Sequence, residues 1–345
     1  KMKNFFSIHT EHHGLVSDKW KLYLNKYDSL LNPYREQEIS LLEIGVQNGG
    51  SLAIWAKFFP QALKITGCDI NPECNKLEYE DNRISIIIGD ANDVDVFKQV
   101  VSEIKTPSII IDDGSHTSSD IIKSFVKYFS ILDNDGVYIV EDLHCSYWSE
   151  YEGGLFHPYS SMAFFKALAD VLNFEFWGIN SQPSMVLQGF FDAYSVELST
   201  EVLLKIHSVE FINSMCIIHK KDADQNVLGK RMVVGENDPV QAGGLELDGL
   251  QMGHINQTQN QWQTTLIKRI EKAEHEITAR DVKISSLSQK LLNHQASITE
   301  LENKLTLREH MIYGLRNSHS WKITAPFRMV STLIRRIYNF CRLKK

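Results

Sequence analysis

Short runs of apolar residues alternate with amphipathic stretches through the first two-thirds of the chain. The apolar runs are rich in isoleucine and valine, are bounded by turn residues, and predict buried strands at 40–46, 64–70, 84–88, 109–111 and 137–140. The stretches between them have helical periodicity. Alternating strands and helices of this kind predict a doubly wound, Rossmann-like α/β sheet within residues 39–221.

Further elements are predicted at both ends of this domain. Residues 1–38 carry a helical pattern through Tyr23 and Tyr27 and are expected to form a helical cap. Residues 208–221 split around Asn213 and Ser214 as a hairpin, which would add an antiparallel edge strand to the sheet.

The pattern then changes twice. Residues 222–257 are rich in Gly, Asn, Gln and Asp and are interpreted as a linker, with an extra strand considered at 231–234. From 258 to 316 the apolar period is seven, and the register positions are Ile270, Ile277, Ile284, Leu291, Ile298, Leu305 and Ile312. The companion positions are mostly leucine, starting at Leu266, and are interrupted by Arg280, His294 and Arg308, which weaken the coil or fix its register. The pattern favours a parallel two-stranded coiled coil and hence a homo-oligomer. The alternative is one amphipathic helix packed on the domain.

Residues 317–345 form a basic tail. From Trp321 onward the tail has seven basic residues and no acidic one, and apolar residues recur at three- and four-residue steps. A basic amphipathic helix can lie on an anionic membrane surface, and a helix docked on protein is the open alternative.

Composition narrows the function classes. A formal net charge of −7 argues against a nucleic-acid partner. The five cysteines form no CxxC pair, and no apolar run is long enough for a membrane span or a signal peptide. These features predict a cytoplasmic protein, peripheral at the inner membrane face if the tail binds lipid.

Acidic residues follow two of the predicted strands. Asp112 and Asp113 end one, with His116 nearby, and Glu141 and Asp142 end the next. Parallel strands present their carboxyl ends on one edge of a sheet, so these groups are expected to meet in a crevice. Crowded carboxylates repel unless a cation lies between them, and oxygen ligands suit magnesium.

A glycine-containing turn follows the first strand. Glu43 precedes Gly45 by two residues, Gly49 follows, and Ser51 opens the next helix; Gln47 breaks the dinucleotide pattern GxGxxG. The turn resembles the first motif of class I S-adenosylmethionine (SAM)-dependent methyltransferases, and a structural glycine turn is the alternative.

Acids after later strands extend the candidate cofactor set. Asp69 ends the second strand, where a carboxylate can accept both ribose hydroxyls. Asp90 ends the third, at the adenine side in methyltransferases, and Asp112 is a further candidate. Any single acid of this kind can instead be a cap or turn residue.

Two motifs support a sharper resemblance. IDDGSH at 111–116 and VEDLHCSYW at 140–148 resemble metal-dependent sugar O-methyltransferases of the macrolide-tailoring type and the cephalosporin-hydroxylase-like family. The resemblance implies SAM and Mg²⁺ as cofactors. It implies Asp113, Glu141 and Asp142 as metal ligands and His116 as general base; a helix-capping turn histidine is the alternative for His116. The candidate substrate-pocket residues are His144, Tyr147 and Trp148.

Residues 318–328 resemble a short SxSWxxTAPxR element found behind coiled coils in bacterial polysaccharide-biosynthesis proteins. This favours a glycan acceptor. The sequence therefore predicts a sugar O-methyltransferase in surface-glycan or glycosylated-metabolite biosynthesis. The alternative is a non-catalytic scaffold for polysaccharide enzymes that retains the fold, while a nicotinamide oxidoreductase is disfavoured by the glycine spacing.

Overall fold

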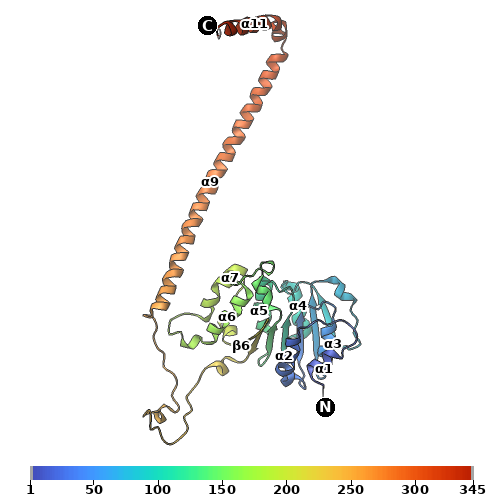
Figure 1. Ribbon diagram of the computed structural model, residues 1–345, viewed down its shortest axis with the longest axis vertical. Helices are drawn as coiled ribbons and strands as arrows, with labels where there is room; N and C mark the ends of the chain where they lie inside the picture. The colour runs from blue at the N-terminus through green and yellow to red at the C-terminus, as the bar shows by residue number, and fades with distance from the viewer. Residues whose placement is uncertain (1–2, 343–345) are drawn as a thin grey trace. The chain divides into compact units, whose positions relative to one another are not determined.

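The computed structural model describes the backbone of residues 3–342, and all of their side chains except those of residues 263–272, 274, 275, 279 and 340–342. The chain divides into two compact units between Thr258 and Gln259. In Figure 1 the first unit runs from blue to yellow and the helices of the second are orange to red.

A seven-stranded sheet forms the centre of the first unit, in the order β3-β2-β1-β4-β5-β7-β6. The strands are β1 (Ser40–Ile44), β2 (Lys64–Asp69), β3 (Ile84–Ile88), β4 (Ile109–Asp112), β5 (Val137–Val140), β6 (Ile206–Ile212) and β7 (Met215–Lys220). Strands β1 to β5 pair in parallel, so the mixed α/β sheet and its first five strands are confirmed.

The predicted hairpin is present, but the antiparallel strand is not at the edge. Strand β7 pairs antiparallel to β5 on one side and to β6 on the other, and β6 forms the edge. The physical reason is burial: five of the six residues of β7 are buried, whereas β6 is mostly exposed or half-buried. The more apolar strand takes the inner position.

Helices cover both faces of the sheet (Figure 1). On one side α1 (Phe5–Thr10), α2 (Lys21–Leu31) and α3 (Gly50–Phe58) pack against alternate strand residues such as Ile109 and Ile111. On the other, the helices pack against the intervening residues, Ile110 among them. They are α4 (Val94–Ile104), α5 (Ser118–Ile131), α6 (Ser161–Leu172), α7 (Gln188–Tyr194) and α8 (Thr200–Leu203).

The extra strand considered at 231–234 within the predicted linker does not form. The isolated antiparallel bridge in the predicted linker joins Lys230 and Gln251, and Met232 and Val234 are each 91% exposed. A strand is stabilised by cross-strand pairs and a covered face, and these side chains have neither. The predicted linker, residues 222–257, contains the short helices η7 (Ala223–Asn226) and η8 (Leu245–Leu247).

The second unit is helical. It consists of α9 (Gln261–Asn317), α10 (His319–Ile323) and α11 (Ala325–Arg342). Within the described residues, no helix has the length and apolar character needed to cross a bilayer. The side chains of Leu266 and Ile270, two of the predicted coiled-coil positions, lie outside the described residues, as does the end of the predicted tail, 343–345.

Candidate active site

A cavity of about 530 Å³ opens at the carboxyl edge of the parallel strands. Its walls are the turns that follow β1 to β5, together with residues 16–20, which precede α2. The edge location is the one that open α/β sheets use for ligands, because helices cover both faces. The acids that the sequence places after successive strands therefore converge on one cavity.

The glycine turn brings β1 close to the loop after β4. Gly45 has φ +92°, and a Cβ there would lie 2.1 Å from the carbonyl oxygen of Asp113. Gly49, at φ +78°, immediately precedes α3. Only a residue without Cβ permits the approach at Gly45. Gly45 lines the cavity, whereas Gly49 is not among the described lining residues.

Asp69 holds the same turn in place. Its Oδ2 accepts hydrogen bonds from the backbone N–H of Val46 (2.7 Å) and of Gln47 (2.9 Å), and its Oδ1 accepts from Asn71 N–H at 2.8 Å. Asp90 lies on the adjacent wall, where its Oδ1 accepts from Asn92 N–H at 2.8 Å. Both candidate cofactor residues line the cavity, and Asp69 also has a structural role in the turn.

Glu43 lies beneath the cavity rather than in its wall. It is fully buried, and its Oε2 accepts from Ser51 Oγ at 2.6 Å. Burial raises the pKa of the Glu43 carboxyl, and Lys19 opposes that effect. Ser51 lines the cavity and Glu43 orients it, so the predicted cofactor contact of Glu43 itself stays a prediction.

Asp112 is also buried, at 4% exposure, and accepts a hydrogen bond from the Tyr138 hydroxyl at 3.1 Å. Burial raises the pKa of Asp112 to about 7. Asp112 lines the cavity wall, and the neutral acid can donate a hydrogen bond there.

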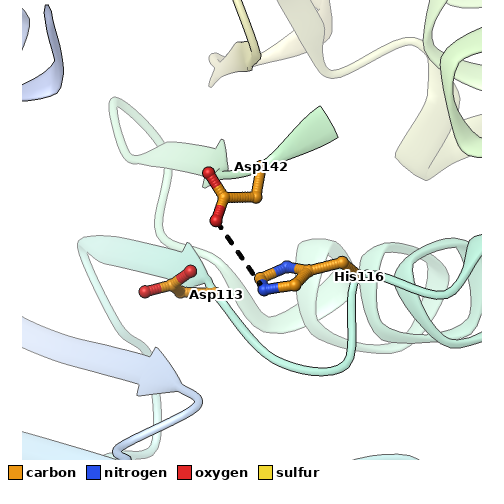
Figure 2. Close-up of side chains that lie close together, drawn as sticks. All are labelled: Asp113, His116 and Asp142. Atoms are coloured by element: carbon orange, nitrogen blue, oxygen red, sulfur yellow. Dashed lines mark ion pairs between the residues drawn. The ribbon is translucent and has the colours of Figure 1, made fainter. Parts of the chain in front are cut away.

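Three side chains converge near one end of the cavity lining. Asp113, His116 and Asp142 each offer one ligand atom, and these atoms all lie within 4.8 Å of one another. Figure 2 shows the three side chains close together, with the His116 imidazole directed toward the Asp142 carboxylate; His116 Nε2 is 3.8 Å from Asp142 Oδ2. Both His116 (φ +58°) and Asp142 (φ +52°) adopt the left-handed conformation, which costs energy and is concentrated at functional sites.

The predicted metal ligand Glu141 is held differently from Asp113 and Asp142. It is 2% exposed, and its Oε1 accepts from Lys19 Nζ at 2.7 Å and from the Tyr27 hydroxyl. Burial, with Asp113 next, raises the pKa of Glu141 to about 8. Glu141 lines the same cavity but is outside the cluster of three, so its ligand role stays a prediction.

Lys19 is a site residue that the sequence analysis missed. Its ammonium bonds Asp113 Oδ2 and Glu141 Oε1, both at 2.7 Å, and lies 3.3 Å from Glu43 Oε1. Burial lowers the pKa of Lys19, but these carboxylates together raise it well above its usual value. A single lysine before a predicted helix carries no pattern that could have identified it.

Among the described residues of this site, the carboxyl groups outnumber the ammonium group of Lys19. Three carboxyl groups contact Lys19, and a fourth, that of Asp142, lies close to Asp113. Such a set fits a hard divalent cation, which takes oxygen ligands and offsets the repulsion among the acids.

Aromatic side chains lie beside Asp142. The Trp20 indole N–H donates to Asp142 Oδ1 at 2.8 Å, and His144 packs edge-on against Trp20 and against Trp148. Tyr147 and Trp148 are 42% and 49% exposed. These three candidate substrate residues are not among the described lining residues, and His144 contacts Trp20, which does line the cavity.

Comparisons with known proteins connect this geometry to a family. Residues 34–148 match the model of the family described as Rhamnosyl O-methyltransferase/CmcI. Over 171 residues the chain is 33% identical to 8-demethyl-8-alpha-L-rhamnosyl tetracenomycin-C 2'-O-methyltransferase of Streptomyces olivaceus, covering 47% of this chain and 44% of that protein. Over 157 residues it is 34% identical to mycinamicin VI 2''-O-methyltransferase of Micromonospora griseorubida, covering 42% and 38%.

A solved structure shares the fold. The MycE methyltransferase from the mycinamycin biosynthetic pathway, in complex with Mg, SAH and mycinamycin VI, matches with a TM-score of 0.54 and 24% identity, over 65% of this chain and 55% of that one. The chain spans less than half the length of the curated relatives it matches. The first unit therefore has a methyltransferase fold, and its segment from β1 through Asp142 matches the Rhamnosyl O-methyltransferase/CmcI family.

Proposed function

We propose that this protein is a SAM-dependent, magnesium-dependent O-methyltransferase that acts on a sugar hydroxyl. The observation that carries the proposal is the convergence of Asp113, His116 and Asp142 on the cavity that the glycine turn, Asp69 and Asp90 also line. The names of the similar proteins, which are sugar-directed O-methyltransferases, support it.

Asp113 and Asp142 would hold the metal ion, with Glu141 as the predicted third ligand. Bound magnesium lowers the pKa of a hydroxyl group that coordinates it, which makes a sugar oxygen a better nucleophile. The two aspartates follow neighbouring strands, and the sheet therefore sets the position of both carboxylates. An acceptor hydroxyl held at these carboxylates would lie beside His116.

His116 would act as general base. A ring nitrogen of the neutral imidazole accepts the hydroxyl proton, and the oxygen then forms a bond to the methyl carbon of SAM. The carbon–sulfur bond breaks with its electron pair remaining on sulfur, which leaves a neutral thioether. Because such a displacement is in line, the enzyme contributes mainly by positioning the two reactants.

The acceptor would lie against the aromatic residues beside Asp142. Trp20, His144 and Trp148 present ring faces and edges there, and aromatic faces pack on the CH groups of sugars. We propose a glycan or glycosylated metabolite as acceptor, and the narrower proposal of a bacterial surface glycan draws on the motif at 318–328.

Calorimetry tests the donor and metal sites. Titration of SAM and of Mg²⁺ into the wild type should show binding of both, whereas Asp113→Asn should bind SAM and lose Mg²⁺. Glu103→Gln is the matched control, because Glu103 pairs with Lys64 at the first residue of β2, the opposite edge of the sheet. Absence of SAM binding by the wild type would overturn the proposal and leave the scaffold alternative.

The second unit supports two proposals about partners. The apolar stripe of α9 is exposed at Ile284, Leu291 and Ile298, and a second copy of the chain, in a parallel coiled coil, would cover it.

Helix α11 combines exposed apolar residues with arginines, and an anionic membrane surface would match both.

A further inference from the structure

Lys19 lies between two carboxylates that the proposed function takes as metal ligands. Its ammonium lies 2.7 Å from Asp113 Oδ2 and 2.7 Å from Glu141 Oε1, and its side chain is only 3% exposed. Glu43 adds a third carboxylate at 3.3 Å. The three acids belong to β1 or directly follow β4 and β5, so one side chain joins the ends of three adjacent strands.

A buried cation with these contacts neutralises acids that would otherwise repel one another. Removing one partner of a buried ion pair leaves an uncompensated charge, which is strongly unfavourable. Replacing Lys19 by another cation therefore costs less free energy than leaving the acids without any cation. Two cations within a few ångströms of each other also repel, so a metal ion on Asp113 and Glu141 disfavours Lys19 at the same oxygens.

We propose that Lys19 is an internal counter-ion that a divalent metal ion displaces from Asp113 and Glu141 when it binds. The inference rests on the proposed function, because it takes these two residues as metal ligands. Displacement frees Glu141 to join Asp113 and Asp142, which reconciles the predicted ligand set with the cluster of Asp113, His116 and Asp142.

The exchange also couples the metal site to the cavity wall. Lys19 belongs to an irregular segment, residues 16–20, that lines the cavity. The segment is attached at both ends: Val16 O accepts from Gly50 N–H at 3.0 Å, and the Trp20 indole donates to Asp142. A Cβ at Gly50 would lie 2.2 Å from Leu15 O, so the chain crosses α3 in direct contact. Displacement of the ammonium therefore changes the contacts of a segment that lines the cavity.

Amine labelling of the wild-type protein tests the exchange directly. The protein is treated with an acetylating reagent with and without saturating Mg²⁺, saturation being checked by calorimetry, and each lysine is quantified by mass spectrometry. Lys19 should react at least about tenfold faster with the metal, because its charge-assisted hydrogen bonds are lost. Lys26 and Lys64, which pair with Glu210 and Glu103 on the surface, serve as controls and should not change.

Protection of Lys19 at metal saturation would overturn the exchange while leaving the metal site of the proposed function intact. Absence of Mg²⁺ binding would overturn both, and SAM titration would then decide whether the methyltransferase proposal survives without the metal.

A variant provides a second measurement. Lys19→Met removes the competing ammonium and should bind Mg²⁺ at least about tenfold more tightly than the wild type, in calorimetry of both proteins at the same pH. Lys26→Met is the matched control and should bind like the wild type. Equal or weaker binding by Lys19→Met would contradict displacement. The labelling experiment needs no variant, so it decides the question even where Lys19→Met fails to fold.

Discussion

Gly45 shows how one residue sets the spacing of the site. Its missing side chain leaves the space that the Asp113 carbonyl occupies, and its positive φ turns β1 toward the loop after β4. The position of a metal-ligand candidate thus depends on the absence of a methyl group one strand away. Asp69 reinforces the same turn through two backbone amides.

Gly45→Ala should therefore destabilise the protein and weaken SAM binding. A strained backbone conformation costs ~1–3 kcal/mol, and the contact with Asp113 adds to that loss. Urea unfolding measures the change in the free energy of unfolding. Gly253→Ala is the control, because nothing lies within 4 Å of a Cβ there, and it should change stability by less than ~0.5 kcal/mol. An unchanged midpoint for Gly45→Ala would show that the loop yields easily.

At the scale of elements, β7 and α5 are joined by a buried lysine. Lys220 of β7 is 4% exposed, and its ammonium donates to the carbonyls of Phe129 and Leu132 at the end of α5, as well as to Ser130. These carbonyls have no partner within the helix, so Lys220 caps it. Burial, with Lys205 next, lowers the pKa of Lys220 to about 8.

This contact predicts a pH dependence of stability. In the unfolded chain a lysine titrates near ~10.4, so between pH 8 and that value the unfolded state binds more protons than the folded state. The free energy of unfolding of the wild type should therefore rise relative to Lys220→Met over this interval, and the gain is lost as pH falls through 8. Urea unfolding at pH 7.5, 9 and 10 measures the difference. Lys221→Met, at the half-exposed neighbouring residue, is the control and should show no such trend. If the difference in free energy of unfolding between the wild type and Lys220→Met does not change with pH, the prediction is refuted.

Helix α9 is long and unusually exposed. Ile284, Ile298 and Ile312 are 49–60% exposed in the single chain, although they keep strict seven-residue spacing. A lone helix of this kind is stabilised mainly by covering its apolar stripe. A second copy supplies a matching stripe in register.

Sedimentation velocity tests the coiled coil. The double variant Ile284→Asp/Ile298→Asp should sediment as a monomer, because it buries charge in the interface, while the wild type sediments as a dimer. The matched variant Gln289→Asp/Asn303→Asp changes the opposite side of the helix and should stay dimeric. Equal sedimentation of wild type and the isoleucine variant would exclude this interface.

At the scale of the whole molecule, charge is unevenly distributed. The chain carries a formal net charge of −7, yet the stretch from Trp321 onward has seven basic residues and no acidic one. Within α11, Phe327, Ile334 and Ile337 are exposed together with these bases. An acidic protein with a basic amphipathic end is expected to bind an anionic surface through that end alone.

Vesicle sedimentation measures this interaction. The protein should pellet with vesicles containing anionic phospholipid and not with neutral ones, and binding should fall as salt increases. Arg335→Glu/Arg336→Glu should abolish binding, whereas the same charge change at the exposed Lys76 and Lys98 should preserve it. Binding that ignores lipid charge would contradict an electrostatic contact.

Much of the fold follows from the sequence alone. The five parallel strands and the hairpin are encoded locally, because apolar runs and turn residues act over a few neighbouring positions. The convergence of Asp113 and Asp142 was also predictable, since parallel strands end on one edge. The strand considered at 231–234 does not form, because two valines and a methionine form a strand only where a partner and a core exist.

The tertiary structure decided the rest. Lys19 is 94 residues from Asp113 and 122 from Glu141 along the chain, and no periodicity connects them. The inner place of β7, the turn-holding role of Asp69 and the burial of Glu43 likewise depend on which surfaces pack together. The sequence by itself determined which residues end the strands, because hydrophobic patterning is local. Only the folded chain determined which charges meet, because electrostatic contacts form between segments that packing brings together.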